Sequence, residues 1–130
     1  MARAKITKKK KKIIVPHAIL NVCARPNNTI LSLAQLNGDV LCQVSCGTLG
    51  FKHCRKSTPH ATQTAIKTIL GKATDLFFVK KLDVVIRSNG IGRESVLTQL
   101  QGNHQIEIGS IEDLTNLAYG GVRWRRNRRV

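Results

Sequence analysis

Long apolar runs are absent from the 130-residue sequence, and a membrane-spanning helix needs about 20 consecutive apolar residues. The short apolar stretch Ile13-Ile14-Val15, which precedes Pro16, is also too short for the apolar region of a secretory signal peptide. We therefore expect an intracellular protein, or one confined to the matrix of an organelle, whose four cysteines are reduced.

Aromatic and acidic residues are scarce as well. Aromatic side chains make up only 4% of the chain, so the core must be built mainly from Ile, Leu, Val and Ala. A metal-dependent nuclease needs clustered carboxylates, whereas the seven acidic residues are scattered and residues 13–24 contain none. Ser45 and Ser57 have no evident His or Asp partners, and the four histidines show no ligand spacing. We expect a protein that is not an enzyme.

The cysteines show no metal-binding pattern. Cys42 and Cys46 are four residues apart on a predicted strand, so their Cα atoms should lie about 13 Å apart, too far to share one zinc ion. No CxxC motif is present, and we interpret the cysteines as small apolar fillers. A zinc ligand shared with a neighbouring protein stays open at His53 and Cys54.

Nucleotide-binding motifs are also incomplete. The stretch GTLGFK at 47–52 has the wrong spacing for a phosphate-binding P-loop, and Gly90-Ile91-Gly92 lacks the third glycine of the dinucleotide fingerprint. We expect no cofactor, no bound metal and no small-molecule substrate.

Positive charge is abundant and concentrated at both ends. The chain has 22 Lys and Arg against seven Asp and Glu, a formal net charge of +15. Residues 1–12 and 123–130 contain twelve of the basic side chains and no acid, whereas 13–122 has ten basic and all seven acidic residues. Such arms are typical of tails that bind a polyanion. Nucleic acid is favoured over an anionic membrane, because no amphipathic helix accompanies the lysines.

The first half of the chain predicts three antiparallel strands, at residues 13–24, 29–34 and 40–46. Turn residues separate them, beginning with Arg25-Pro26-Asn27-Asn28. Asn37-Gly38 predicts a type I′ hairpin turn, whose two central residues both need φ > 0.

The second half predicts two helices and two strands. Thr58 and Pro59 indicate the N-cap and first residue of a helix. Its apolar face recurs at helical spacing: Ala61, Ala65, Ile66, Ile69, Leu70, Ala73, Leu76 and Phe77. A strand is expected at 82–86 and a second helix after the glycine loop 88–94, with Val96, Leu97 and Leu100 buried. The last strand, at 105–111, offers Ile106, Ile108 and Ile111 as core positions.

The order β-β-β-α-β-α-β predicts an α/β fold with a mixed sheet and helices packed against it. We expect a basic N-terminal arm at 1–12, one α/β domain at 13–114 and a basic C-terminal tail at 115–130. The arms should be disordered when free and ordered on a nucleic acid.

Two loops place glycines and basic side chains just before a predicted helix. Lys52, Arg55 and Lys56 belong to the first loop, and Arg87 and Arg93 to the second. Free backbone N–H groups and the helix dipole favour an anion at such a position. Together with the two arms, these loops point to phosphate groups.

Five motifs occur in a familiar order: NNTI at 27–30, Asn37-Gly38 with Val40-Leu41, GFKxxRKxTP at 50–59, GIGRE at 90–94 and RRV at 128–130. In this order and spacing the chain resembles the family of small-subunit ribosomal protein eleven, from about residue 17 to the C-terminus. The resemblance implies a ribonuclease-H-like fold without the nuclease. It also implies a structural place on the platform of the small subunit, on the central domain of small-subunit rRNA near the mRNA exit path. Neighbours would be small-subunit proteins eighteen and twenty-one, with seven as a further candidate.

The predicted RNA contacts combine the two arms, the two basic loops and the motif positions that the resemblance carries over. They are Arg3, Lys5, Lys8, Lys9, Lys10, Lys11, Lys12, Asn27, Asn28, Thr29, Lys52, His53, Arg55, Lys56, Arg87, Ser88, Asn89, Gly90, Gly92, Arg93, Arg123, Trp124, Arg125, Arg126, Arg128 and Arg129.

The chain departs from the family pattern in several places, among them Ser88-Asn89-Gly90 where the family has Gly-Pro-Gly. Cys46 and Cys54 replace small residues, and His53 replaces a glycine. The tail lacks the family's prolines, which removes a stiff extended path. Trp124 either stacks on a base or caps the domain's core. This drift suggests an organellar ribosome, mitochondrial more than plastid, with the bacterial cytoplasm as another alternative. Competing functions are a histone-like nucleic-acid compactor and a degenerate nucleic-acid-processing enzyme.

Overall fold

The computed structural model describes residues 14–130, so the basic arm predicted at 1–12 lies outside the described residues. The elements follow in this order: β1 (His17–Arg25), β2 (Asn28–Gln35), β3 (Val40–Ser45), η1 (His53–Ser57), α1 (Pro59–Phe77), β4 (Lys81–Arg87), α2 (Gly92–Gln101) and β5 (Glu107–Asp113). The predicted order β-β-β-α-β-α-β is confirmed, and the short 3₁₀ helix η1 adds an element that the sequence pattern did not indicate.

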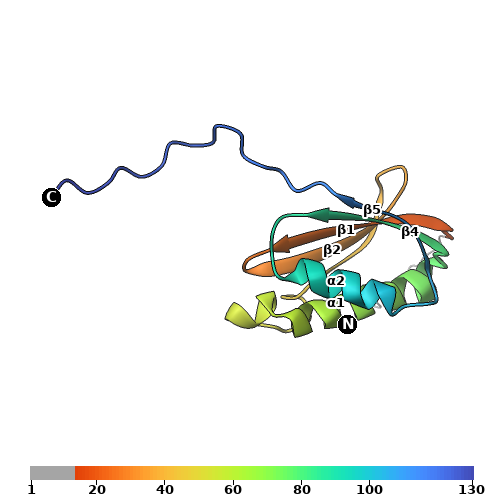
Figure 1. The fold of residues 1–130 in the computed structure, drawn as a ribbon. Coiled ribbons are helices and arrows are strands. Elements are labelled where there is room, and N and C mark those ends of the chain that lie inside the picture. Colours follow the sequence, from red (N-terminus) through yellow and green to blue (C-terminus); the bar gives the residue numbers. More distant parts are fainter. Residues whose placement is uncertain (1–13) are drawn as a thin grey trace, which may run out of the picture.

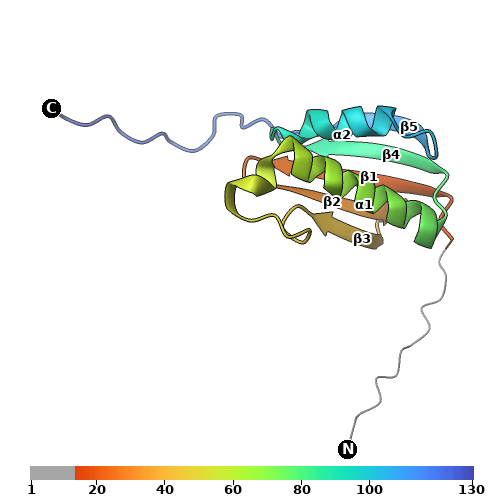
Figure 2. The same cartoon turned by 90° about the horizontal axis from the view of Figure 1, so that it is seen from below.

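The five strands form one mixed sheet in the order β3-β2-β1-β4-β5. β2 pairs antiparallel with β1 and β3, whereas β4 pairs parallel with β1 and β5. The parallel connections require crossovers, and α1 and α2 provide them. Both helices lie on the same face of the sheet (Figures 1 and 2), and within the described chain no helix covers the opposite face. The predicted mixed α/β sheet is thus confirmed.

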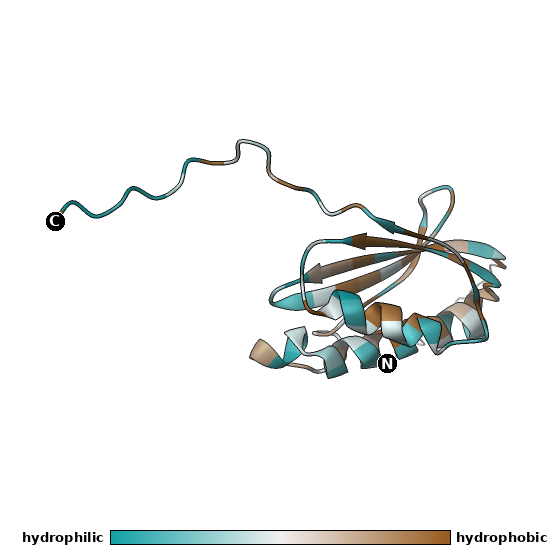
Figure 3. Cartoon of the chain, in the orientation of Figure 1, coloured by the Kyte–Doolittle hydropathy of each residue, from teal (hydrophilic) through white to brown (hydrophobic). Residues whose placement is uncertain are grey.

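The core lies between the sheet and the two helices. Along β1 every second residue is buried, and the buried ones, Leu20 and Val22 among them, face Ile66 and Ile69 of α1 in one apolar cluster. Figure 3 shows the corresponding hydrophobic colouring of the central strands. Among residues 14–130 no helix is long and apolar enough to cross a bilayer.

Two predicted core positions are wrong. Leu76 is 55% exposed and Ile111 is 53% exposed. Leu76 has the right helical spacing, but it falls in the last turn of α1, close to where the helix ends at Phe77. Ile111 lies on the edge strand β5, which has no strand beyond it, next to a shift in the β4–β5 register.

The start of β1 differs from the prediction. The first strand begins at His17 rather than at residue 13. Pro16 has no N–H to donate, and the N–H of Val15 donates instead to the carbonyl of Phe77, at 3.0 Å. The entering chain is therefore attached to the end of α1 before the sheet begins.

The β2–β3 hairpin is not the predicted type I′ turn. Gly38 has φ of 94°, but Asn37 does not have positive φ. The N–H of Gly38 donates to the carbonyl of Gln35 at 3.0 Å, and the N–H of Gln35 donates to the carbonyl of Asp39 at 2.9 Å. These bonds enclose residues 36–38 as a three-residue loop, a common hairpin connection in which only the last residue is left-handed.

The start of α1 is as predicted. Thr58 is the N-cap, its Oγ1 accepts the N–H of Ala61 at 3.3 Å, and Pro59 is the first helical residue. The C-cap residue Phe78, which follows the last helical residue Phe77, has left-handed φ of 54°. Thr62 Oγ1 lies 3.3 Å from Thr29 Oγ1 at the start of β2, so the N-terminal end of α1 is placed beside the β1–β2 turn.

Candidate nucleic-acid interface

The carboxyl ends of the three parallel strands meet at one edge of the sheet. β1, β4 and β5 run parallel, so Arg25, Arg87 and Asp113, at their last positions, lie at the same edge. β2 begins there, because Asn28 pairs with Arg25, and β3 ends there, because Ser45 pairs with Ile30. We call this edge, with its loops and the start of α1, the carboxyl end of the domain.

The carboxyl end gathers predicted sites that are far apart in the sequence. They are the turn residues Asn27 and Asn28, the residues of the η1 segment (52–57) Lys52, His53, Arg55 and Lys56, and, from the end of β4 to the start of α2, Arg87, Ser88, Asn89, Gly90, Gly92 and Arg93. In Figure 2, η1, the β1–β2 turn and the beginning of the C-terminal tail all lie toward the left of the domain. The fold thus brings both predicted basic loops to one end.

The η1 segment presents exposed positive charge. Lys52, His53 and Arg55 are exposed, and the stem of Lys56 lies across Gly47. In the described part of the chain no carboxylate oxygen lies within 4.0 Å of the amino or guanidinium nitrogens of this segment. Its cations are therefore available to an external anion.

The predicted anion site at the N-terminus of α1 is largely occupied by the chain itself. Pro59 has no N–H, the N–H of Ala61 donates to Thr58 Oγ1, and that of Thr62 donates to the carbonyl of Thr58. Of the first four helical residues, only His60 has an N–H with no hydrogen-bond partner among residues 14–130. Attraction of phosphate here must come from the η1 side chains rather than from the helix end.

The glycine loop before α2 has a packing role. Gly90 is buried, and its N–H donates to the carbonyl of Ala24 at 2.6 Å. A Cβ at Gly90 would lie 2.7 Å from the carbonyl carbon of Ala24, and one at Gly92 would lie 2.5 Å from Oγ1 of the buried Thr29. Gly90, Gly92 and Thr29 therefore hold the loop against β1 and β2, and their contact with RNA stays a prediction. Asn89 and Ile91 remain exposed on the outside of the loop.

Arg93 is paired within the protein. Its guanidinium forms an ion pair with Asp113, at the end of β5. Thr115 donates its hydroxyl to Asp113 Oδ1 at 2.6 Å and its N–H at 3.1 Å. The Thr115 hydroxyl, with its N–H and the Arg93 guanidinium, lowers the pKa of the Asp113 carboxyl. Asp113 is thus an anion that neutralises Arg93, so Arg93 offers less charge to RNA than its sequence position suggested.

Arg25 is a candidate interface residue that the sequence reasoning missed. It is exposed at the end of β1 and lines a hollow together with Arg87 and Asn89. Its position directly before the Pro26-Asn27-Asn28 turn was the signal available in the sequence.

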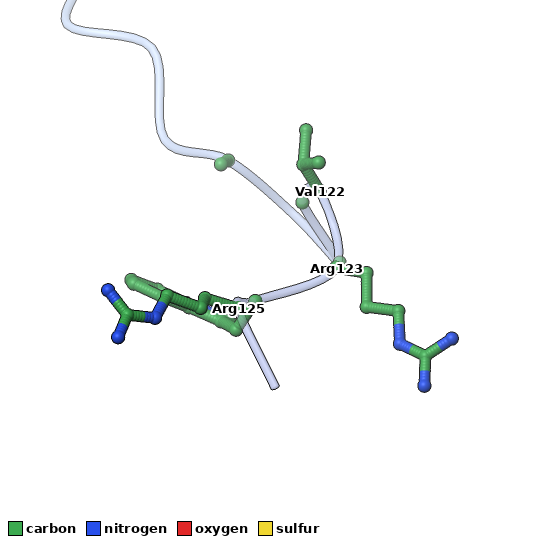
Figure 4. Close-up of a pocket in the computed structure, with 7 residues that line it drawn as sticks. Val122, Arg123 and Arg125 are labelled. Atoms are coloured by element: carbon green, nitrogen blue, oxygen red, sulfur yellow. The ribbon is translucent and has the colours of Figure 1, made fainter. Parts of the chain in front are cut away.

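The C-terminal tail leaves the domain at the carboxyl end and extends away from it (Figure 1). Trp124 is 92% exposed, so it does not cap the core. The tail bends at Gly120 and Gly121, which have φ of 73° and 43°. The hollow drawn in Figure 4 is lined only by tail residues, and Arg123 and Arg125 point away from each other there. The tail therefore presents its side chains to solvent.

The cysteines occupy different environments. Cys46 is fully buried, as a filler should be, whereas Cys54 is exposed on η1, so the filler interpretation is wrong for Cys54. Burial raises the pKa of the partly buried Cys42, and nearby Lys72 offsets part of that rise. Across residues 14–130 no group of three or more His, Cys, Asp or Glu side chains is arranged to hold a metal ion.

These environments predict an order of thiol alkylation. With iodoacetamide at pH 8, Cys54 should react fastest, Cys42 more slowly and Cys46 not at all in the folded protein. The thiolate is the nucleophile, and the reagent must reach it from solvent. Since burial raises its pKa, Cys42 should become more reactive as the pH is raised above 8. Peptide mass spectrometry gives the three rates. C54A should remove the fast reaction and change the free energy of unfolding by no more than about 0.5 kcal/mol. Alkylation of Cys54 as slow as that of Cys46 would contradict this arrangement.

The fold and the interface define a class of protein. A small α/β domain that exposes cations on loops at one end, with an arginine-rich tail leaving from that end, is typical of proteins that bind a nucleic acid along its backbone. The chain belongs to the ribosomal protein S11 family, whose model matches residues 18–129. This confirms the family resemblance that the sequence motifs indicated. The proteins of this family are ribosomal structural proteins rather than enzymes, and the chain is not an enzyme.

Several bacterial proteins are similar to the chain over nearly its full length. A protein of Nautilia profundicola is 36% identical over 131 residues, covering 100% of both chains. Proteins of Thermosipho melanesiensis and Thermotoga maritima are each 36% identical over 124 residues, covering 95% of this chain and 95% and 94% of theirs. All three are named small ribosomal subunit protein uS11.

Proposed function

We propose that the protein is a structural constituent of the small ribosomal subunit that binds small-subunit rRNA through the carboxyl end of its domain and its basic tail. The observation that carries this proposal is the gathering of two basic loops, distant in sequence, at the edge from which the arginine-rich tail departs. Membership of the ribosomal protein S11 family supports it.

The mechanism of binding is charge neutralisation by a preformed surface. The buried glycines keep the loop before α2 against the strands, so the loops at the carboxyl end keep their positions when RNA docks. The exposed cations of η1 and the tail arginines then neutralise phosphates where RNA helices crowd together, and released counterions favour binding. The arm at residues 1–12, whose seven basic side chains lie outside the described residues, would add to the same attraction.

The finer location rests on the motifs shared with the family. We place the protein on the platform of the small subunit, on the central domain of small-subunit rRNA near the mRNA exit path. Its neighbours there would be small-subunit proteins eighteen and twenty-one, with seven as a further candidate. For the compartment we propose a mitochondrial ribosome, supported by the departures at His53, Cys54 and the proline-free tail. The relatives compared above are bacterial. Plastid and bacterial ribosomes are therefore the alternatives, and cell fractionation would show which ribosomes contain the protein.

A competition experiment tests the proposal against a histone-like compactor. The full chain is bound to a labelled transcript of the rRNA central domain, and duplex DNA of equal phosphate content competes at fixed salt. We expect the rRNA to bind more tightly, with log K falling by about 0.7–0.9 per neutralised phosphate for each decade of salt. Equal affinity for the two polymers would contradict the proposal and favour the compactor.

A further inference from the structure

A hollow on the uncovered face of the sheet lies at the carboxyl end, beside the second basic loop. Its walls include Arg25 and Arg87 at the ends of β1 and β4, Asn89 of the following loop, and Leu114 and Asn116 of the tail, with Cys23 between them. Cys23 alternates along β1 with the buried Val22 and Ala24, so it faces away from the helices. We call this feature the open-face hollow. We propose that it holds one unpaired nucleotide of RNA, a proposal that rests on the RNA-binding function above.

Two arginines supply the recognition of phosphate. Arg87 pairs in register with Cys23, and Arg25 lies two residues further along β1, so both belong to the same face of adjacent strands. Both are exposed, and within the described chain neither guanidinium has a carboxylate oxygen within 4.0 Å. A guanidinium binds phosphate oxygens in a bidentate manner and also stacks on the planes of bases. This pair differs from Arg93, whose charge Asp113 neutralises.

The opposite wall is a fixed segment of the tail. The N–H of Leu114 donates to the carbonyl of Ile86 at 2.9 Å, which continues the β4–β5 pairing by one bond. Thr115 is attached to Asp113 Oδ1 through both its N–H and its hydroxyl. The start of the tail is therefore held beside Arg87, and the hollow exists before any ligand arrives.

The remaining groups suit a base better than a second phosphate. The amides of Asn89 and Asn116 each offer donors and an acceptor, the combination that base edges require, and Cys23 and Leu114 supply apolar surface. The hollow has a volume of about 540 Å³. Bases in a duplex are stacked and paired, whereas bases of bulges and loops are free to enter such a site. The carboxylates of an acidic peptide would pair with the two arginines but would not need the amides of Asn89 and Asn116.

The experiment compares two RNA hairpins that differ by one unpaired adenosine in the stem. R25Q/R87Q should lower the affinity of the full chain for the bulged hairpin by about tenfold or more, because charged hydrogen bonds are lost. For the fully paired hairpin, R25Q/R87Q should lose no more affinity than K67Q/K72Q does. K67Q/K72Q is the control, with the same charge change on α1. N116A should reduce the preference for the bulged hairpin without changing the salt dependence. Unfolding in urea checks that each variant is folded.

Alkylation of Cys23 gives a second readout that does not depend on affinity. In the C54A background, saturating bulged hairpin should slow the reaction of Cys23 with iodoacetamide, whereas the paired hairpin should not, and Cys42 serves as the internal reference. Equal losses of R25Q/R87Q on both hairpins, or no protection of Cys23, would overturn the inference while the RNA-binding function stands. A polyglutamate peptide that protects Cys23 and displaces the bulged hairpin would overturn it in favour of a protein partner. If neither hairpin nor central-domain rRNA binds the parent protein, the proposed function itself fails.

Discussion

Replacing Gly90 with alanine is expected to lower the free energy of unfolding by about 3 kcal/mol or more, the upper part of the range for overpacking. The new Cβ would lie 2.7 Å from the carbonyl carbon of Ala24 and 2.9 Å from the carbonyl oxygen of Arg25. These are backbone atoms of β1, which cannot move aside as a flexible side chain could. The loop would have to leave the strand and lose the 2.6 Å hydrogen bond from Gly90 N–H to Ala24. Urea unfolding followed by circular dichroism measures the change.

Gly71 provides the matched control for this substitution. It lies inside α1, and a Cβ there would meet no atom within 4 Å. G71A should therefore raise the free energy of unfolding by about 0.5–1 kcal/mol, because alanine is the better helix former. If G90A were no more destabilising than G71A, the close approach of the glycine loop to β1 would be contradicted.

Neutralising the η1 cations is expected to weaken RNA binding and to leave the fold intact. K52Q/R55Q/K56Q should reduce the affinity for central-domain rRNA by about 10- to 100-fold near 0.1 M salt and lower the slope of log K against log salt by about 2–3. The physical reason is that three cations with no carboxylate within 4.0 Å in the described chain no longer release counterions from the RNA. Filter binding over a salt series measures both quantities.

A triple variant of equal charge change separates a local effect from a change in net charge. Lys67, Lys72 and Lys80 lie along α1 and after it, and the N–H of Lys80 donates to Pro16 at the opposite end of the sheet from η1. K67Q/K72Q/K80Q should reduce the affinity by no more than about threefold, since only the long-range field changes. Equal losses in the two triple variants would show that binding does not favour the carboxyl end.

Local signals in the sequence predicted most of the fold. The Thr58-Pro59 start of α1, the period-two strands and the order of the elements depend on neighbouring residues alone, and these features were confirmed. Burial was less predictable at positions where it depends on the end of a helix or on whether a further strand lies beside the sheet. Leu76 has helical spacing but lies in the last turn of α1, and Ile111 lies on the edge strand.

The candidate interface was predictable only where it depends on local sequence. Charge density identified the η1 cations and the tail arginines directly from the sequence. The burial of Gly90 and the pairing of Arg93 with Asp113, 20 residues away, arise only when α2 and β5 pack beside β1 and β4. Arg25 joins Arg87 because their strands are parallel neighbours, a relation that the chain order does not reveal.

Sedimentation tests most directly whether the protein is a structural component of the small ribosomal subunit. A lysate of cells that express the tagged full chain is separated on a sucrose gradient under conditions that dissociate the two subunits. The protein is expected to travel with the small-subunit peak and to leave it, together with other electrostatically bound proteins, only at high salt. Sedimentation at the top of the gradient at low salt, or with chromatin rather than with small subunits, would contradict the account.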